Sequence, residues 1–257
     1  EAFVEAGILS GNLYSRVDIL LPANEEEWDI VEVKSSTSVK DVHIQDAAYQ
    51  RYCCTKLGLN IRKCYAAIIN NQYVKEGEID PEGLFNLHDI TEDVLAISDD
   101  IPNQVEEMFE VINRENCPEM LIGPHCKDPY DCPLEECWEH LPEGNVFTLY
   151  YNGKKSFGLY DRGIVSIKDI PGDYKLSGKQ AIQKESLVTG ETHLDKEAIK
   201  GFLVSLEHPL YYMDFETINP AVPLFNGTRP YQHTPFQSSV HVVRDAHSNP
   251  EKGEFRP

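Results

Sequence analysis

The sequence predicts an α/β protein in which a mixed sheet flanked by helices precedes the first strands of a second module. Three observations lead to this prediction. Strand-like and helix-like patterns alternate along the first half of the chain. With 257 residues, the chain is long enough for one large domain or two smaller ones. Its 41% apolar and 26% charged residues are typical of a globular protein, and no window is apolar for long enough to span a bilayer.

The first predicted element is a strand at residues 13–22, LYSRVDILLP, which ends at Pro22 before the polar turn ANEEE. The stretch WDIVEVKSS, residues 28–36, is rich in Ile and Val and predicts a second strand. A short polar connection between two strands favours an antiparallel hairpin, so we expect these two strands to pair.

A helix is expected next, over residues 38–59, with Val42, Ala48 and Tyr52 among its buried positions and Gly58 near its end. Two more strands and an amphipathic helix complete the first half of the chain. These are expected at residues 63–70, 83–91 and 99–115. The order strand, strand, helix, strand, helix is that of an α/β domain.

The second half of the chain carries a different kind of sequence. Residues 142–194 are rich in Gly and Lys, with short strand-like runs such as VFTLYY, and predict a linker or a small β subdomain. A helix at 195–208 and strands at 209–217 and 235–245 would open a new α/β domain. We therefore expect three regions, residues 1–141, 142–194 and 195–257, and we expect both ends to be cut within longer domains.

The net charge of −20 is concentrated in one half of the chain. Residues 1–150 hold 30 Asp and Glu against 10 Lys and Arg, whereas the remainder is balanced. An acidic half argues against broad non-specific binding of phosphates, which relies on clustered cations. An enzyme that reaches nucleic acid through divalent cations stays possible, because a bound metal changes the local sign of charge. The alternative for most of these acids is a solvated surface.

The strongest chemical pattern lies on the second strand. Side chains two apart on a strand share a face, so Glu32 and Lys34 lie together, while Val31 and Val33 share the other, buried face. The hairpin brings Asp18 beside them. Two carboxylates and a lysine suit metal-assisted hydrolysis of a phosphodiester, because carboxylates hold Mg²⁺ or Mn²⁺ and the lysine orients water or stabilises developing charge. The alternative is a solvated face or a surface ion pair.

The following helix adds two more candidates. Gln45 and Tyr49 stand four residues apart, which places them on one face of the helix, where both can reach the strand ends. The alternative is that Gln45 faces water and Tyr49 packs in the core.

The order Asp18, then EVK at 32–34, then QDAAY at 45–49 resembles the PD-(D/E)XK nucleases of the RecB type. The resemblance covers roughly the first 140 residues and implies a restriction-endonuclease-like core. It also implies that Asp18 and Glu32 bind the metal, that the backbone carbonyl of Val33 adds a ligand and that Lys34 is catalytic. Gln45 and Tyr49 would lie near the site and the DNA. The family's upstream helix, often with a histidine ligand, has no counterpart in this sequence.

Three cysteines, Cys126, Cys132 and Cys137, are spaced C-x5-C-x4-C in a proline-rich segment. Thiolates this close can bind an iron–sulfur cluster or Zn²⁺. The odd count of seven cysteines and the lack of an export signal favour metal binding or burial over disulfides, and a cytoplasmic location. Candidates for a fourth ligand are Cys117, His125, Cys53, Cys54 and Cys64, of which the last three are expected to be structural.

This segment is similar to that of RecB-type nucleases with a cysteine cluster, including CRISPR-associated adaptation nucleases. The resemblance implies a [4Fe–4S] cluster whose fourth cysteine lies outside this chain, before Glu1.

Asp214 and Glu216 share one face of the apolar strand YYMDFET. This D-x-E pattern resembles the opening motif of DEDD 3′–5′ exonucleases with an RNase H-like fold, which implies two catalytic metals held by both acids. Later acidic motifs cannot be assigned, and solvated acids at a strand end are the alternative. The succession of both modules resembles an uncharacterised bacterial family that joins them.

These patterns together predict a metal-dependent nuclease that acts on DNA, on single strands or ends, as an exonuclease or end-processing enzyme in repair, defence or CRISPR-type processing. Two other classes stay open. The nuclease fold can serve as a non-catalytic module that binds nucleic acid or protein, and the cysteines can make the protein redox-responsive.

Overall fold

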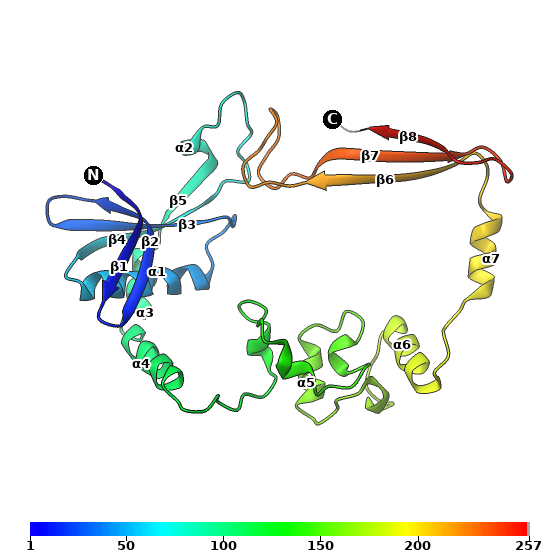
Figure 1. Ribbon diagram of the computed structural model, residues 1–257, viewed down its shortest axis with the longest axis horizontal. Coiled ribbons are helices and arrows are strands. Elements are labelled where there is room, and N and C mark those ends of the chain that lie inside the picture. The colour runs from blue at the N-terminus through cyan, green and yellow to red at the C-terminus, as the bar shows by residue number, and fades with distance from the viewer. Residues whose placement is uncertain (256–257) are drawn as a thin grey trace. The chain divides into compact units, whose positions relative to one another are not determined.

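A mixed five-stranded sheet organises the N-terminal part of the protein (Figure 1). In this computed structural model, which describes residues 1–255, the strands lie in the order β1-β2-β3-β4-β5. Their bounds are Phe3–Ser10, Leu13–Pro22, Glu27–Lys34, Asn60–Ile69 and Phe85–Asp89. Strands β3 and β4 pair in parallel and the other neighbours are antiparallel. The predicted α/β class with a mixed sheet is therefore confirmed, as is the hairpin of β2 and β3.

Strand β1 was not among the predicted strands. It pairs with β2 through a tight turn at Gly11, whose φ of 62° lies in the left-handed region that favours glycine. Its side chains Val4 and Leu9 are exposed, so β1 lacks the clean alternation that marks a half-buried strand. The sequence signal is weak for that reason.

Four helices accompany this sheet. Their bounds are Asp41–Lys56 for α1, Pro81–Leu84 for α2, Thr91–Ser98 for α3 and Ile101–Ile112 for α4. Helix α1 connects the parallel strands β3 and β4 and lies against one face of the sheet (Figure 1). Its Ala48 and Cys53 pack with Ile30 of β3 and Ile68 of β4 in the main core. Small side chains on α1 let it approach the sheet closely.

The two faces of β3 differ from the expectation in one respect. Val31 is buried as predicted, but Val33 is 36% exposed, whereas Glu32 on the opposite face is 5% exposed. The reason is that α1 packs on the face that carries Ile30 and Glu32. The acid thus sits at the border of the main core and not on an open face.

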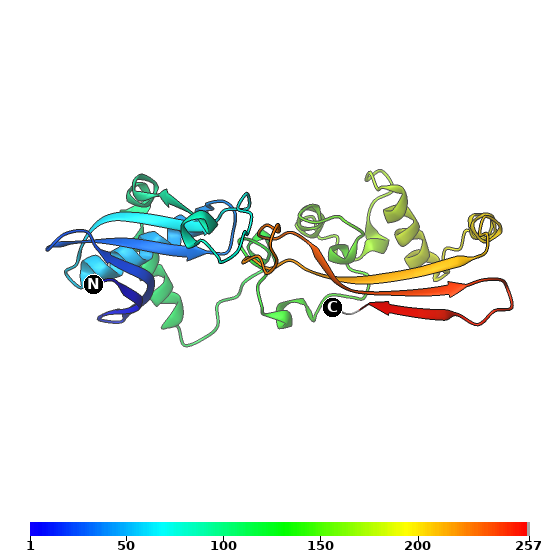
Figure 2. The same cartoon turned by 90° about the horizontal axis from the view of Figure 1, so that it is seen from above.

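The C-terminal part forms a second sheet of three antiparallel strands that run side by side (Figures 1 and 2). Their bounds are Leu210–Ile218 for β6, Thr234–Val243 for β7 and Glu251–Phe255 for β8. The two strands expected in this region are confirmed. Several large apolar side chains of β6, including Tyr211, Met213 and Phe215, are exposed. The RNase H-like assignment stays a prediction.

Residues 116–207 form a compact unit of their own, whereas residues 1–115 group with residues 208–257. The unit is helical, with a small core that includes Val146, Leu159 and Ile167. Its helices are α5 (Lys155–Tyr160), α6 (Gly178–Thr189) and α7 (Lys196–Val204), with the 3₁₀ turns η1 (Pro124–Cys126), η2 (Glu135–Trp138), η3 (Val146–Thr148) and η4 (Ile167–Asp169). No helix among residues 1–255 is both long and apolar enough to cross a membrane.

Residues 142–194, expected to be a linker or a small β subdomain, contain 3₁₀ turns and helices where strand-like runs were expected. The run VFTLYY begins with η3, because the Asn145 side chain accepts a hydrogen bond from the Phe147 amide at 3.1 Å and starts a helical turn. The described part of this segment contains a single β-bridge, between Asn145 and Ser166. Short apolar runs do not distinguish a strand from a buried turn or helix by period alone.

The cysteine-bearing segment belongs to this helical unit, which differs from the expected boundary at residue 141. Trp138 packs edge-on against Phe147, with ring centroids 4.9 Å apart, and Cys126 packs against Ile122 and Phe157. Aromatic packing therefore ties the cysteine segment to the later residues of the unit.

Candidate functional site

Glu32 and Lys34 meet at the C-terminal end of β3, as the strand period predicted. The Lys34 Nζ atom lies 2.7 Å from Glu32 Oε1 and 2.7 Å from Asp46 Oδ2 of helix α1. The structure thus adds Asp46 to the predicted pair. Burial opposes the charged form of Lys34, but hydrogen bonds and charges from Asp46 and Glu32 outweigh it and raise the lysine pKa above its ordinary value.

Gln50 is a second residue of α1 at this site. Its Nε2 atom donates a 2.5 Å hydrogen bond to Glu32 Oε2, so both oxygens of the buried carboxylate have a partner. The Gln50 Oε1 atom is buried and has no hydrogen-bond partner among the described residues. Gln50 and Asp46 are four residues apart, the spacing that places two side chains on one helix face.

Gln45 and Tyr49 do not join the Glu32–Lys34 pair. Gln45 is exposed, and the Tyr49 hydroxyl donates to the Tyr14 carbonyl at 3.1 Å while its ring packs against the main core. This is the alternative arrangement considered for the two residues. The helix face directed at Glu32 is one position further along, at Asp46 and Gln50.

Asp18 lies across the hairpin from the pair. The backbone pairing of β2 with β3 ends at Ile19 and Val31, and beyond it the Asp18 Oδ2 atom accepts a 2.7 Å hydrogen bond from the Val33 amide. A carboxylate therefore replaces the backbone acceptor at this point. The Asp18 side chain is thus held on the neighbouring strand beside Val33, the residue that follows Glu32.

His43 is a further group near the pair that sequence reasoning missed. It is 4% exposed, and its Nδ1 atom accepts a 3.2 Å hydrogen bond from the Lys40 amide. Burial, followed by the positive charges of Lys34 and Lys40, lowers the His43 pKa below 6.5. The ring is consequently neutral at pH 7. A lone histidine in a helix gave no sequence signal for this placement.

The donors at the strand ends are of the kind that a hard cation prefers. Asp18, Glu32 and the Val33 carbonyl offer oxygens, the ligand class of Mg²⁺ and Mn²⁺, and the Gln50 amide holds an oxygen without a donor. In the described structure Lys34 forms ion pairs with the carboxylates of both Glu32 and Asp46. Within residues 1–255 no three His, Cys, Asp or Glu side chains converge in a group that could hold a metal ion. The donor types suit a divalent cation, but the described side chains that carry them are not gathered around one point.

The three cysteines of the C-x5-C-x4-C motif are not gathered into a ligand cluster. Cys126 is buried against Phe157, whereas Cys132 and Cys137 are exposed. Backbone groups join the first two, through the Cys132 amide that donates to the Cys126 carbonyl at 2.9 Å. In this arrangement the three thiols do not fit a [4Fe–4S] cluster or a zinc ion.

The remaining core cysteines are structural, as expected. Cys53, Cys54 and Cys64 are buried in the main core. Burial raises the pKa of Cys54 to about 11 and that of Cys64 to about 12, so both are neutral thiols.

Asp214 and Glu216 stand two residues apart on β6, opposite Ser239 and Gln237 of β7. Both acids are exposed, and no other acid joins them in a metal-holding group among the described residues. The pairing shows a shared face, as predicted, without a completed site.

Residues 211–256 match a sequence family described as a domain of unknown function, DUF2779. The match spans strands β6 to β8 and includes Asp214 and Glu216, and it leaves the Glu32 site outside. No curated protein and no solved structure matches the chain.

Proposed function

We propose that the chain is a metal-dependent nuclease that hydrolyses DNA phosphodiester bonds, as an exonuclease or end-processing enzyme. The observation that carries the proposal is the Glu32–Lys34 pair, held at the end of a central strand with the Asp18 carboxylate on the neighbouring strand. The donor chemistry of these residues and their resemblance to PD-(D/E)XK nucleases support it, as does a mixed sheet flanked by helices.

In this proposal Asp18, Glu32 and the Val33 carbonyl hold Mg²⁺ or Mn²⁺. A divalent cation there would supply charge stabilisation to the scissile phosphate. Gln50 orients the Glu32 carboxylate through its hydrogen bond. The chain itself contributes a carboxylate that is fixed before any substrate arrives, which avoids reorganisation during the reaction.

Lys34 acts as a cation and not as a base. Because its pKa is raised, the amine stays protonated at neutral pH. The ammonium orients the attacking water and stabilises the charge that develops on the phosphate. In the hydrolysis, the water oxygen bonds to phosphorus as the phosphorus–oxygen ester bond breaks, and the proton that this water loses is taken up through solvent by the leaving oxygen.

The test is a cleavage assay on end-labelled single- and double-stranded DNA with Mg²⁺ or Mn²⁺. Glu32→Gln is expected to lower the single-turnover rate at least about 100-fold, the scale on which one transition-state contact acts. Glu25→Gln removes an exposed carboxylate from the adjacent turn and is expected to leave the rate unchanged. Equal rates in wild type and Glu32→Gln would contradict the proposal.

A non-catalytic binding module is the second candidate, and one observation favours it. Lys34 already pairs with Glu32 and Asp46, a closed arrangement that also suits a structural ion-pair cluster. Binding of nucleic acid without any metal-dependent cleavage would support this candidate.

We extend the proposal to the two remaining motifs. Asp214 and Glu216 would form a second, RNase H-like exonuclease centre, to be tested by Asp214→Asn in the same assay.

Cys126, Cys132 and Cys137 would bind a metal cluster only after rearrangement, to be tested by iron, sulfide and zinc analysis of anaerobically purified protein. Seven free cysteines suit the reducing cytoplasm. Equal rates in oxidised, reduced and metal-free preparations would exclude redox control.

A further inference from the structure

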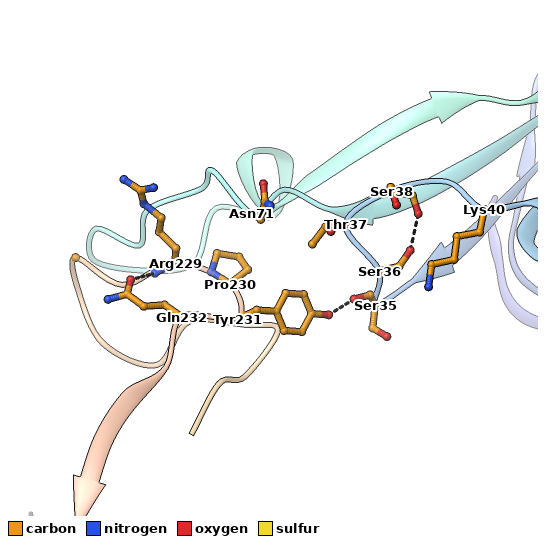
Figure 3. A pocket seen from close by; sticks show the side chains of 11 residues that line it. Ser35, Ser36, Thr37, Ser38, Lys40, Asn71, Arg229, Pro230, Tyr231 and Gln232 are labelled. Carbon is orange, nitrogen blue, oxygen red and sulfur yellow. Dashed lines mark hydrogen bonds between the residues drawn. The ribbon is translucent and has the colours of Figure 1, made fainter. Parts of the chain in front are cut away.

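The loop that follows β3 and a segment near the start of β7 line a polar cavity of about 960 Å³ that is open to solvent (Figure 3). One wall carries the hydroxyl side chains of residues 35–38 and the amine of Lys40, and the other carries Arg229 and Tyr231. The described lining includes two cationic side chains and no carboxylate. Such a lining stands out in a chain of net charge −20.

The wall formed by residues 226–232 is fixed by hydrogen bonds to the loop after β4. The Gly227 amide donates to the Lys75 carbonyl at 2.8 Å, and the Lys75 amide donates to the Thr228 carbonyl at 3.1 Å. Asn226 Oδ1 accepts from the Gly77 amide at 3.0 Å. These hydrogen bonds fix residues 226–232 against the loop that follows β4.

Tyr231 closes the contact on the other side of the cavity, where its hydroxyl donates to the Ser35 carbonyl (Figure 3). The wall therefore joins both loops that leave the ends of β3 and β4. Residues 226–232 also lie within the segment that matches DUF2779, whereas the opposite wall lies outside it.

The chemistry of the lining suits phosphate groups. Hydroxyls, backbone amides, lysine and arginine are the groups that contact phosphates in protein–nucleic acid complexes. Lys40 and Arg229 stand at opposite ends of the cavity, with the hydroxyl loop and Tyr231 between them (Figure 3). Two cations at opposite ends of the lining suit a ligand that carries more than one phosphate.

The cavity adjoins the Glu32–Lys34 site. Ser35 directly follows Lys34, and the Lys40 amide binds the His43 ring, whose pKa is lowered in part by the charges of both lysines. His43 therefore lies near both Lys34, in the Glu32 site, and Lys40, in the cavity lining. A phosphate backbone held in the cavity would lead toward the strand end that carries Glu32.

We propose that this cavity binds the phosphodiester backbone of a single-stranded nucleic acid and guides it to the Glu32–Lys34 end of β3. The inference rests on the proposed nuclease function and names its substrate class. Cavities of about 300–1,000 Å³ hold ligands the size of a drug molecule, so a cavity of about 960 Å³ has room for a short stretch of one strand. Residues 226–232 would then form one wall of the substrate-binding site beside the N-terminal sheet.

The test measures the binding of fluorescent 12-nucleotide single-stranded DNA, single-stranded RNA and duplex DNA to the full chain in EDTA, by anisotropy at several salt concentrations. The variant is Lys40→Gln with Arg229→Gln. Its control is Lys56→Gln with Arg16→Gln, which removes the same charge from exposed positions away from the cavity lining. Thermal unfolding of each variant establishes that it is folded.

Wild type is expected to bind single strands more tightly than duplex, and the cavity variant is expected to lose at least about tenfold in affinity. Its slope of log affinity against log salt should fall by about 1.4, because each phosphate contact to a single strand contributes about 0.7. The binding ratio of DNA to RNA then shows which sugar the cavity prefers.

Equal affinity and slope in the cavity variant and its control would overturn the inference, as would a preference for duplex. Because EDTA removes divalent cations, the binding result does not depend on cleavage. If the protein cleaves DNA but the cavity variant binds as tightly as wild type, the proposed role of the cavity is refuted and the nuclease function is not. If binding depends on salt as expected but no cleavage occurs, the proposed nuclease function is refuted and the role of the cavity is not. Tyr231→Phe supplies a milder second variant, expected to weaken binding by loosening the wall.

Discussion

A buried carboxylate requires donors and a compensating charge, and Glu32 has both. Lys34 supplies the charge and Gln50 a hydrogen bond, which leaves the carboxylate satisfied on the core side of β3. The strand period was enough to predict that Glu32 and Lys34 share a face, and the hairpin was enough to bring Asp18 near them. That Gln50 of α1 would be the hydrogen-bond partner of Glu32 could not be predicted, because the rotation of α1 about its axis depends on how Ala48 packs on the sheet.

The structure places Gln50, and not Gln45, on the face of α1 that contacts Glu32, and this placement can be tested. Gln50→Leu removes the donor to Glu32 and leaves a buried oxygen unpaired, so the free energy of unfolding should fall by about 1–3 kcal/mol in urea titrations at pH 7. Gln45→Leu changes an exposed side chain and should stay within about 0.5 kcal/mol of wild type. The reverse order would place Gln45 at the site and contradict the geometry.

His43 gives a prediction about pH. Its pKa is lowered in the folded protein, so below pH 6.5 the unfolded chain binds more protons than the folded one at this residue. The contribution of His43 to stability is therefore full above pH 6.5 and falls as the pH drops below it. His43→Asn keeps an acceptor for the Lys40 amide but does not titrate.

Unfolding free energies measured from pH 7.5 to 5 should decline less steeply for His43→Asn than for wild type. Parallel declines would show that the ring is not the titrating group.

At the scale of elements, the long amphipathic and alternating patterns were predictable and the short ones were not. Pro22 and the polar turn after it defined the hairpin of β2 and β3, and the expected strand at 209–217 forms β6. The run that begins at Val146 was misjudged because its first three residues form a 3₁₀ turn, capped by Asn145, which no period reveals. Contacts distant in sequence decide such segments.

The packing of α1 on β3 positions Glu32. Loss of a buried side chain from this interface should therefore lower the stability of the protein. Ile30 is fully buried in that interface, so Ile30→Ala should lower the free energy of unfolding by about 2–5 kcal/mol. Val4→Ala, on the exposed side of β1, should change it by less than about 0.5 kcal/mol. Similar losses from both substitutions would mean that α1 does not pack on this face of β3.

On the scale of the whole molecule, the chain divides into two compact units, with boundaries after residue 115 and before residue 208. The sequence predicted a change of character after the first module, but it did not reveal that the cysteine segment packs with the later residues of its unit through Trp138 and Phe147. The acidic charge likewise hid the cavity of Lys40 and Arg229, because a composition average says nothing about where cations gather.

The division predicts that stability can be lowered in one unit alone. Ile167 is buried in the small core of residues 116–207, so Ile167→Ala should accelerate amide hydrogen exchange across that unit. Protection of strands β2 to β4 should persist. Loss of protection in both units to the same degree would show that they unfold as one.

The central proposal is that Asp18 of β2 and the C-terminal end of β3 form a site for a hard divalent cation, and Mn²⁺ binding measured by electron paramagnetic resonance tests it most directly. Wild type and Glu25→Gln should each bind one Mn²⁺ more tightly than the weak background of surface carboxylates, and Glu32→Gln should lose that ion while keeping the background. Identical titration curves for wild type and Glu32→Gln would contradict the claim and leave Glu32 and Lys34 as a structural ion pair.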